Sequence, residues 1–418
     1  MQVADLSSIP APADRRLAVR LTADALRQVR AGHPWVYADS ITSASHDGAV
    51  GDLAVVFDQD RKFAAIALFD PTSPIRLKVL HHGKPITIDR AFWRERLTAA
   101  LDLRRSLAAS GDDRDDATTG YRCVNGENDG MPGFVLDRYD RTLVLKLYSA
   151  MWVPHLPTIV PLIDELLHPE ALVLRLARSI EPALLHGLEE GDALLGTAPT
   201  EPVLFRERGL VFEADVVHGQ KTGHFLDQRD NRALFGSMVR GAEVCDVFAS
   251  TGGFTVHAAA GGATSVVAID LSAPTLAVAQ RNLQHNMHLP AVAACRFTPV
   301  VADAFREMER LARNGRRFDA IVVDPPSFAQ RQHEADRALA AYSKLTTLAV
   351  RLLRPGGLLV QCSCSSRVTA EQFHRTVALA ASRAGRPFDE IRRTAHAVDH
   401  PVRFTEGAYL KAVFARVP

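Results

Sequence analysis

The segment Asp246-Val247-Phe248-Ala249-Ser250-Thr251-Gly252-Gly253-Phe254 combines an apolar strand, a glycine turn and the start of a helix. Glycines in such a turn let the backbone approach a ligand closely, and the first amides of the helix can donate hydrogen bonds to it. Seventeen residues beyond Gly253, the strand predicted over 266–269 ends in Asp270, where a carboxylate can accept hydrogen bonds from ribose hydroxyls. This order of strand, turn, helix, strand and acid predicts a nucleoside-binding unit.

Similar apolar runs continue on both sides of this unit. Strands are predicted at 244–249, 266–269, 299–302, 318–323 and 358–361, with helical segments between them. Runs without polar alternation, separated by helices, are typical of a parallel sheet that is covered on both faces. Such doubly wound sheets bind ligands beyond the carboxyl ends of their strands. The residues at those ends are therefore the candidate site.

Two features of this region favour S-adenosylmethionine over a dinucleotide as the ligand. The turn differs from the G-x-G-x-x-G turn of dinucleotide folds. Asp303 follows the third strand, where a carboxylate can accept a hydrogen bond from an adenine amino group. A turn with only a structural role is the alternative. The predicted cofactor contacts are Phe248, Ser250, Gly252, Gly253, Phe254, Asp270 and Asp303.

The strand predicted over 318–323 leads into Asp324-Pro325-Pro326-Ser327-Phe328. Two prolines remove two amide donors and make the loop rigid, so its carbonyl groups and its carboxylate can face a planar substrate. A turn that only ends the strand is the alternative. We predict substrate contacts at Pro325, Pro326 and Phe328, with Asp324 facing both cofactor and substrate.

The last buried strand leads into Cys362-Ser363-Cys364. Side chains two residues apart share a face, and only Cys364 lies beyond the carboxyl end of the strand. Cys364 is therefore the candidate nucleophile, whereas Cys362 is expected to be a small buried side chain. The C5 carbon of a pyrimidine is a weak nucleophile, but a thiolate that adds to C6 converts the ring into an enamine. A cysteine at this position favours methylation of carbon.

Carbon methylation also requires a base that removes the C5 proton. The late segment 399–411 offers Glu406 and His400, and Glu406 is preferred because it lies in a loop before an apolar run. A Cys-x-Cys pair with His374 does not supply the four well-spaced ligands that zinc requires. No metal site is predicted.

Composition places the chain among ordinary globular proteins. Its 418 residues are 47% hydrophobic and 23% charged, which predicts two to three domains. The net charge of +1 means that nucleic-acid binding must come from local patches. Five cysteines without a regular framework favour a reducing cytoplasm over a secreted disulfide scaffold. Because no apolar stretch reaches about 18 residues, no membrane partner is expected.

Two joints rich in glycine and acids or prolines, at 108–130 and 191–202, divide the chain. Short β-rich runs before the first joint predict a small β-domain, and a helix is predicted over 88–107. Between the joints, a hairpin at 133–148 and a strand at 172–176 predict a compact α+β unit. One solvated helix face is expected to carry Arg94, Arg96, Arg104 and Arg105.

Several short motifs occur in one order along nearly the whole chain. They are Gly32-His33-Pro34-Trp35-Val36, Asn125-Gly126-Glu127-Asn128-Asp129-Gly130-Met131-Pro132-Gly133, His218-Gly219-Gln220-Lys221-Thr222-Gly223, Phe225-Leu226-Asp227-Gln228-Arg229, Thr251-Gly252-Gly253-Phe254, Asp324-Pro325-Pro326, Ser363-Cys364-Ser365 and His400-Pro401-Val402. This collinear set resembles the PUA-domain-containing class I S-adenosylmethionine-dependent RNA methyltransferases, a group that includes cytosine-C5 enzymes of 23S rRNA.

The resemblance implies an α/β fold with a small β-rich PUA domain at 1–82, a central α+β domain at 83–200 and a C-terminal Rossmann-like methyltransferase domain at 201–418. It implies Cys364 as the nucleophile and Asp324 as the residue that holds the target base. It further implies RNA, with 23S rRNA favoured, as the partner, and it leaves room for a homodimer. The contacts that it adds along the cleft are Gln228 and Arg229 for the cofactor and Lys221 for the substrate.

The chain departs from the family pattern at two positions. Relatives often carry a lysine in place of Ser327 and an aromatic residue in place of Ser250. A neutral donor at 327 replaces a charge-assisted one, which affects how the base or the RNA backbone is held. Neither departure removes the cofactor site or the thiol.

We predict a cytoplasmic enzyme that forms 5-methylcytidine in large-subunit rRNA. An RNA amine or purine-nitrogen methyltransferase without a covalent intermediate is the alternative, because the Asp324 loop resembles the loops of enzymes that hold an exocyclic amine. The turn lacks the glycine pattern of a nicotinamide-dependent oxidoreductase. A catalytically silent RNA-binding protein is disfavoured by the acids and the thiol in one cleft.

Overall fold

A computed structural model describes residues 3–108, 116–219, 221–329 and 331–418. Part of the joint expected at 108–130, and Gln220 of the predicted motifs, lie outside the described residues. The chain forms two compact units. The first contains Met1–Arg206, Ala214–His224 and Val398–Phe404, and the second contains Glu207–Glu213, Phe225–Ala397 and Thr405–Pro418.

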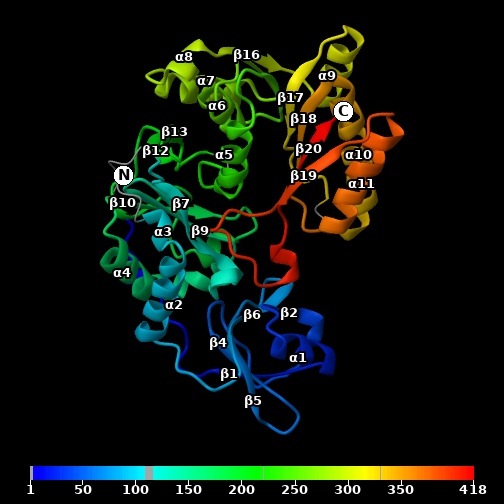
Figure 1. Cartoon of the computed structure of the whole chain (residues 1–418). Coiled ribbons are helices and arrows are strands. Elements are labelled where there is room, and N and C mark those ends of the chain that lie inside the picture. The colour runs from blue at the N-terminus through cyan, green and yellow to red at the C-terminus, as the bar shows by residue number, and fades with distance from the viewer. Residues whose placement is uncertain (1–2, 109–115, 220, 330) are drawn as a thin grey trace. The chain divides into compact units, whose positions relative to one another are not determined.

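The first unit begins with a six-stranded sheet and one helix, α1 (Figure 1). The strand order is β2-β6-β5-β4-β1-β3, and β1 pairs in parallel with β4. Leu17, Val19 and Val56 point into a small core that also contains Val29 of the helix. This is the small β-domain expected from the sequence. Its elements are β1 (Leu17–Leu21), α1 (Ala23–Arg30), β2 (Trp35–Tyr37), β3 (Ile41–Ala44), β4 (Leu53–Phe57), β5 (Phe63–Phe69) and β6 (Ile75–His82).

A second sheet in the same unit has the order β11-β10-β9-β8-β7. Tyr139 and Thr142 pair at the end of the predicted hairpin. The helix predicted over 88–107 begins at Arg90 because Asp89 caps it by accepting from the amide of Phe92. The elements are α2 (Arg90–Leu103), α3 (Arg105–Ala108), β7 (Gly120–Asn125), β8 (Phe134–Tyr139), β9 (Thr142–Leu147), α4 (Leu156–Leu167), β10 (Ala171–Leu176) and β11 (Ala193–Gly196).

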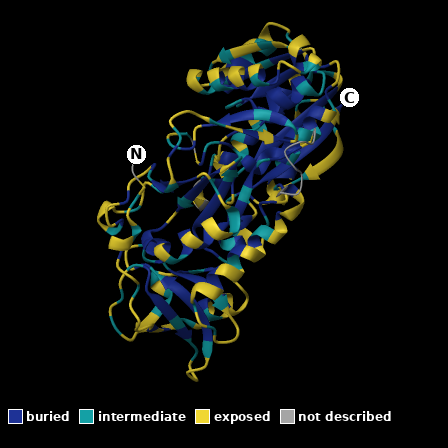
Figure 2. Cartoon of the chain, turned by 90° about the vertical axis from the view of Figure 1, so that its left-hand side faces the viewer, coloured by how far each residue is buried: buried dark blue, intermediate teal, exposed yellow. Residues whose placement is uncertain are grey.

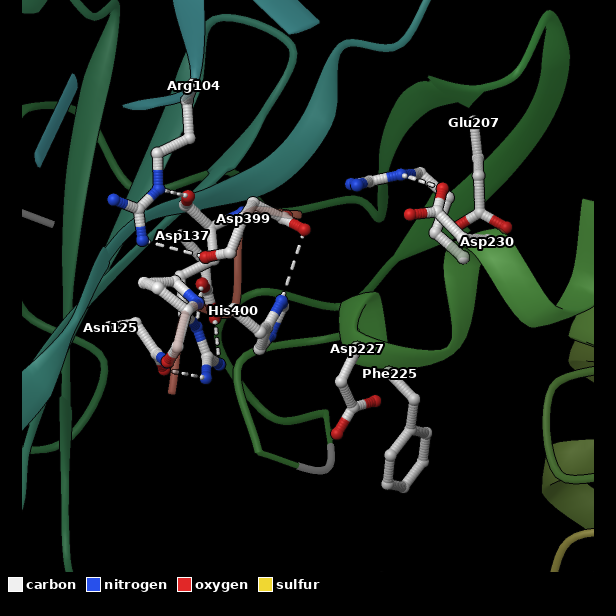
Figure 3. A network of polar contacts seen from close by, with 12 residues as sticks. Arg104, Asn125, Asp137, Glu207, Phe225, Asp227, Asp230, Asp399 and His400 are labelled. Atoms are coloured by element: carbon white, nitrogen blue, oxygen red, sulfur yellow. Dashed lines mark hydrogen bonds and ion pairs between the residues drawn. The ribbon is translucent and has the colours of Figure 1, made fainter. Parts of the chain in front are cut away.

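A buried polar network anchors the returning segment Val398–Phe404 within this unit (Figure 3). The Arg104 guanidinium donates to both carboxylate oxygens of Asp129, at 3.0 and 2.7 Å, and to the carbonyl of Asp399 at 2.7 Å. Arg122 donates its side chain to Asp137 at 2.7 and 3.0 Å and its amide to the Asp399 carboxylate at 2.8 Å. Arg104 is 1% exposed, so its expected place on a solvated helix face was wrong.

The second unit is built around a seven-stranded sheet of order β16-β15-β14-β17-β18-β20-β19. The first five strands are parallel, and β20 is antiparallel to both of its neighbours. The elements are α5 (Arg229–Ser237), β14 (Glu243–Val247), α6 (Gly253–Ala260), β15 (Ser265–Asp270), α7 (Ala273–His285), α8 (Pro290–Ala294), β16 (Arg296–Val301), α9 (Ala304–Arg313), β17 (Phe318–Val323), α10 (Ala335–Leu352), β18 (Leu353–Ser363), α11 (Ala370–Arg383), β19 (Asp389–Thr394) and β20 (Lys411–Val417). A separate pair of strands, β12 (Val203–Glu207) and β13 (Leu210–Ala214), precedes them.

Apolar cores cover both faces of the seven-stranded sheet, as predicted for a doubly wound fold. Along β17, Ile321 and Val323 enter one core, and Ala320 and Val322 enter the opposite one. Figure 2 shows the central strands buried and the outer faces of the surrounding helices exposed. The strand predicted over 244–249 ends earlier because the backbone turns into the left-handed region at Phe248, whose φ is 65°.

Among the residues that the structure describes, no helix has the length and apolar character needed to cross a membrane.

Candidate active site

The carboxyl ends of the parallel strands bring most of the predicted site residues to one edge of the sheet. Asp270 ends β15, Asp303 follows β16, Asp324 follows β17 and Cys364 follows β18. The glycine turn follows β14, the central strand of these five. The sequence prediction that these groups share an edge is therefore confirmed by the strand order.

The glycine turn is fixed by close packing against two helices. Gly252 has a φ of 78° and precedes α6, and a Cβ there would lie 2.6 Å from the Cβ of Ala279. At Gly253, a Cβ would lie 2.6 Å from Cδ of Arg232. Phe254 packs against Phe235 in the core, with ring centroids 5.7 Å apart. Its contribution to a cofactor would therefore come from the backbone.

Asp270 holds the turn in place through its carboxylate. One oxygen accepts from the amide of Ser250 at 2.9 Å, and the other accepts from the amide of Ser272 at 2.9 Å. A carboxylate can accept about four hydrogen bonds, so acceptor capacity remains for ribose hydroxyls. Asp303 is exposed and caps α9 by accepting from the amide of Arg306 at 3.0 Å.

The surroundings of Asp324 shift the pKa of its carboxyl group. Burial and the nearby negative charge of Asp227 raise the pKa of Asp324 to about 7, against a hydrogen bond from Gln228 that lowers it. Nε2 of Gln228 donates to Asp324 at 2.8 Å, and Nδ2 of Asn231 donates to Gln228 at 2.6 Å. A carboxyl group with this pKa carries a proton in part of the molecules near neutral pH. Asn231, which orients Gln228, was not among the residues predicted from the sequence.

The Cys364 loop is hydrogen-bonded to the loop that carries Asp324. Sγ of Cys364 donates to the carbonyl of Pro325 at 3.5 Å, and Oγ of Ser365 donates to the carbonyl of Ala329 at 3.2 Å. Cys364 is partly exposed, whereas Cys362 is fully buried, and burial raises the pKa of Cys362 well above its ordinary value. A buried neutral thiol is a poor nucleophile. The burial of Cys362 is as predicted, and the role of Cys364 as nucleophile stays a prediction.

Lys411 is a second residue that sequence reasoning missed. The residue is buried, and its ammonium group donates to the carbonyls of Ser365 and Val368 on the chain just after the thiol. Burial lowers the pKa of Lys411 to about 8, and the charge of Cys364 opposes that shift. A lysine that opens the apolar strand β20 was the available signal in the sequence.

The other predicted contact residues differ in how far they are buried and in what they pack against. Arg229 is fully buried, with Nε 3.4 Å from Asp230. Phe328 packs against Tyr342 and Phe248, with ring centroids 5.4 and 6.5 Å away. Pro325 is buried and Pro326 is exposed.

The two candidate bases lie in different compact units. Glu406 is partly exposed in a short turn, Thr405–Gly407, of the second unit. His400 is buried in the first unit, with Nδ1 3.2 Å from the Asp399 carboxylate. Lys221 also belongs to the first unit, where it is exposed.

Asp246, within β14, is a buried carboxylate beside the glycine turn. One oxygen accepts from the Thr255 hydroxyl at 2.7 Å, and the other has no hydrogen-bond partner among the described residues. Burial raises the pKa of Asp246 to about 7. Asp246 is the first residue of the strand–turn–helix segment 246–254, but no local pattern distinguishes it from the other acids.

The charge of the acids at this edge indicates which class of nucleoside cofactor can bind there. S-adenosylmethionine carries a positive sulfonium and an ammonium group, whereas dinucleotides carry a negative pyrophosphate. Asp246, Asp270, Asp303 and Asp324 place negative or acceptor groups at this edge. These acceptor groups therefore fit S-adenosylmethionine.

The sequence matches two family models. Residues 19–82 match a PUA-like domain, and residues 189–387 match an S-adenosylmethionine-dependent methyltransferase. With the doubly wound sheet and its acidic edge, these matches define the chain as an S-adenosylmethionine-dependent methyltransferase with an N-terminal PUA-like domain.

Relatives extend this assignment over nearly the full chain. A Deinococcus radiodurans ribosomal RNA large subunit methyltransferase is 44% identical, over 98% of this chain and 100% of that protein. A Pseudoalteromonas translucida ribosomal RNA large subunit methyltransferase I is 34% identical, over 96% of this chain and 99% of that one. The chain belongs to the ribosomal RNA large subunit methyltransferase family. Among solved structures, SMU.776, described as a methyltransferase complexed with SAH, has the same fold, with a TM-score of 0.80 at 21% identity over 96% of this chain and 100% of that one.

Proposed function

We propose that this chain forms 5-methylcytidine in 23S rRNA through a covalent bond between Cys364 and C6 of the target cytosine. The observation that carries the proposal is the position of the thiol. Cys364 follows β18 directly, and its Sγ contacts the carbonyl of Pro325 in the loop that begins with Asp324. A nucleophile and a carboxyl group that carries a proton near pH 7 thus belong to two joined loops at the cofactor edge.

The proposed reaction begins when the Cys364 thiolate forms a bond to C6. The electrons of the C5–C6 double bond form a C4–C5 double bond, and the electrons of the C4–N3 double bond take up a proton at N3 from the protonated Asp324. C5 then uses the C4–C5 electrons to bond to the methyl group that bound S-adenosylmethionine would supply. The bond from that methyl group to the sulfonium sulfur breaks, S-adenosylhomocysteine is the leaving group, and the C4–N3 double bond re-forms. A base then removes the C5 proton, the C5–C6 double bond re-forms, the sulfur leaves as thiolate, and the N3 proton returns to Asp324.

Charged neighbours support these roles. The ammonium of Lys411 interacts favourably with a negative Cys364, which favours the thiolate needed for addition. We assign the removal of the C5 proton to Glu406, which belongs to the same compact unit as the thiol.

The remaining assignments complete the proposed complex. Gln228, Arg229 and Phe248 line the cofactor, and Pro325, Pro326, Phe328 and Lys221 contact the RNA. The division into a PUA domain at 1–82, a central domain at 83–200 and a catalytic domain at 201–418 is part of this proposal.

The proposal also includes a cytoplasmic location and a homodimer. Five free cysteines suit a reducing cytoplasm. Sedimentation of the pure protein tests whether it forms a homodimer.

Replacement of the nucleophile tests the proposal. Cys364→Ser should lower the rate of 5-methylcytidine formation by at least about 10³, because a serine hydroxyl does not add to C6 under these conditions. The measurement is nucleoside mass spectrometry of 23S rRNA from cells lacking the gene, methylated by pure protein. The partly exposed Cys295 offers the matched control, Cys295→Ser, which should retain activity.

A second readout detects the covalent bond itself. RNA with 5-fluorocytidine at the target keeps its C5 substituent, so the wild type should remain attached to it in a denaturing gel, whereas Cys364→Ser should not. Loss of a methylated amine or purine from the gene-deficient rRNA, with 5-methylcytidine unchanged, would favour the amine or purine-nitrogen alternative instead.

A further inference from the structure

The first sheet carries a hollow of about 390 Å³ over strands β1, β3 and β4. It lies in the part of the molecule that Figure 1 labels with β1 and β4. The side chains that matter for its chemistry are Ala18, Arg20, Ser43, Ala44, Phe57 and Arg61. None of them belongs to the methyltransferase edge.

Strand register explains why a hollow forms here. Arg20 pairs with Ser43 of β3 on one side and with Phe57 of β4 on the other, so the three residues form one row across the sheet. Leu17 and Val19 point into the core, and the alternate positions Ala18 and Arg20 are exposed. The side chains of Ala18, Ser43 and Ala44 are small and leave the space of the hollow between Arg20 and Phe57. The edge strand β3 leaves one side open.

The two arginines of the hollow differ from two arginines of the neighbouring helix α1. Arg30 pairs with Asp58 at 2.7 Å, and Arg27 pairs with Asp24. Among the described residues, no carboxylate pairs with Arg20 or with Arg61. Asp58, one of the two acids of the adjoining turn, already accepts from Arg30 and from the amides of two turn residues. The hollow is therefore lined by two arginines that form no ion pair within the part of the chain that the structure describes.

We propose that this hollow binds one nucleotide of single-stranded RNA, with a phosphate between Arg20 and Arg61 and the base against Phe57. Guanidinium groups bind phosphate through charge-assisted hydrogen bonds, and unstacked bases lie on aromatic rings. Its volume is at the lower end of the roughly 300–1,000 Å³ of small-ligand sites, which suits one nucleotide. The inference rests on the proposed function, because it names where the first unit holds the RNA substrate.

Binding of a fluorescein-labelled 12-nucleotide oligo(U) to the full-length protein tests the site, with anisotropy measured across a KCl series. The Arg20→Ala/Arg61→Ala variant should bind at least about tenfold more weakly, and its slope of log K against log[KCl] should be shallower by about 0.7, because the contact with one phosphate is lost. Phe57→Leu should weaken binding roughly tenfold through lost stacking and leave the slope unchanged.

The matched control is Arg375→Ala/Arg383→Ala on α11, which removes the same charge from exposed positions in the second unit. It should bind oligo(U) like the wild type, and circular dichroism with thermal melting checks that every variant is folded. Unchanged affinity and slope in Arg20→Ala/Arg61→Ala would overturn the proposal. So would an equal loss of binding to a 12-base-pair RNA duplex, since backbone attraction alone would then explain the effect.

A methylation assay separates this inference from the proposed function. If the wild type forms 5-methylcytidine but the hollow variants bind normally, only the RNA site is wrong. If the hollow variants lose oligo(U) binding but the wild type forms no 5-methylcytidine, only the assigned chemistry is wrong.

Discussion

Asp129 in the first unit and Asp246 in the second are both buried carboxylates, but their surroundings differ. Asp129 accepts two hydrogen bonds from Arg104 and a third from the amide of Asn125. Asp246 accepts one from a hydroxyl, and its second oxygen has no hydrogen-bond partner among the described residues. Burial raises the pKa of Asp246, and that of Asp324 in the same edge, to about 7.

The comparison distinguishes two uses of a buried carboxylate. Asp129 stabilises the fold through its hydrogen bonds, whereas Asp246 keeps an oxygen available for a ligand. Both oxygens of Asp129 are already held by a guanidinium group, and one also accepts from an amide, so this carboxylate serves the fold. Two carboxyl groups with raised pKa values, close enough to affect each other, favour binding of a cation or a proton. The first unit thus uses its buried acids for structure, and the second keeps some of them available for chemistry.

Replacement of Arg104, the cation that pairs with Asp129, should have the largest effect on stability. Arg104→Leu leaves Asp129 buried without its partner, so the free energy of unfolding should fall by about 3–5 kcal/mol. Urea unfolding followed by tryptophan fluorescence measures the change. Arg105→Leu is the control, because Arg105 is exposed and its pair with Asp102 should contribute no more than about 1 kcal/mol. Equal losses in the two variants would contradict a structural role for the network.

At the catalytic edge, Asp324→Asn should lower activity and leave the fold intact. Without a proton donor for N3, methylation should slow roughly a hundredfold, equivalent to about 2.7 kcal/mol. The wild-type rate should fall as pH rises through about 7, since Asp324 then loses its proton, and this limb should be absent from the variant. Calorimetric titration with S-adenosylhomocysteine checks that cofactor affinity changes much less than the rate. If the rate of Asp324→Asn still falls as pH rises through about 7, a group other than Asp324 causes that fall.

The same comparison shows what the sequence could predict. The glycine turn, the Asp324 loop and Cys364 are each local signals, and the alternation of strands and helices is enough to place them at one edge. Arg104 was predicted on a solvated face because its partners, Asp129 and Asp399, are distant in the sequence. Lys411 was missed for the same reason, since its hydrogen bonds reach Ser365 and Val368 on another segment. Contacts that depend on tertiary packing leave no local pattern.

The smallest predicted effect concerns the pH dependence of stability. A folded pKa raised from 3.8 to about 7 means that Asp246 contributes stability below about pH 4, and that this contribution is lost as pH rises through about 7. Asp246→Asn removes the titrating group, so the unfolding free energy should decline less between pH 5 and pH 8 than in the wild type. One unit of pKa shift corresponds to about 1.4 kcal/mol, and neighbouring acids share the proton, so a difference of at least about 1 kcal/mol is expected.

Urea unfolding at both pH values, without added cofactor, measures this difference. Asp303→Asn is the matched control, because Asp303 is exposed and asparagine is an equally good helix cap. The control should follow the wild-type pH dependence. If Asp246→Asn also follows it, Asp246 remains charged in the folded protein at pH 5, and an unrecognised cation near β14 must compensate it. If the dependence flattens, the carboxyl group is held at the expense of stability, as expected for a group that a positively charged ligand completes.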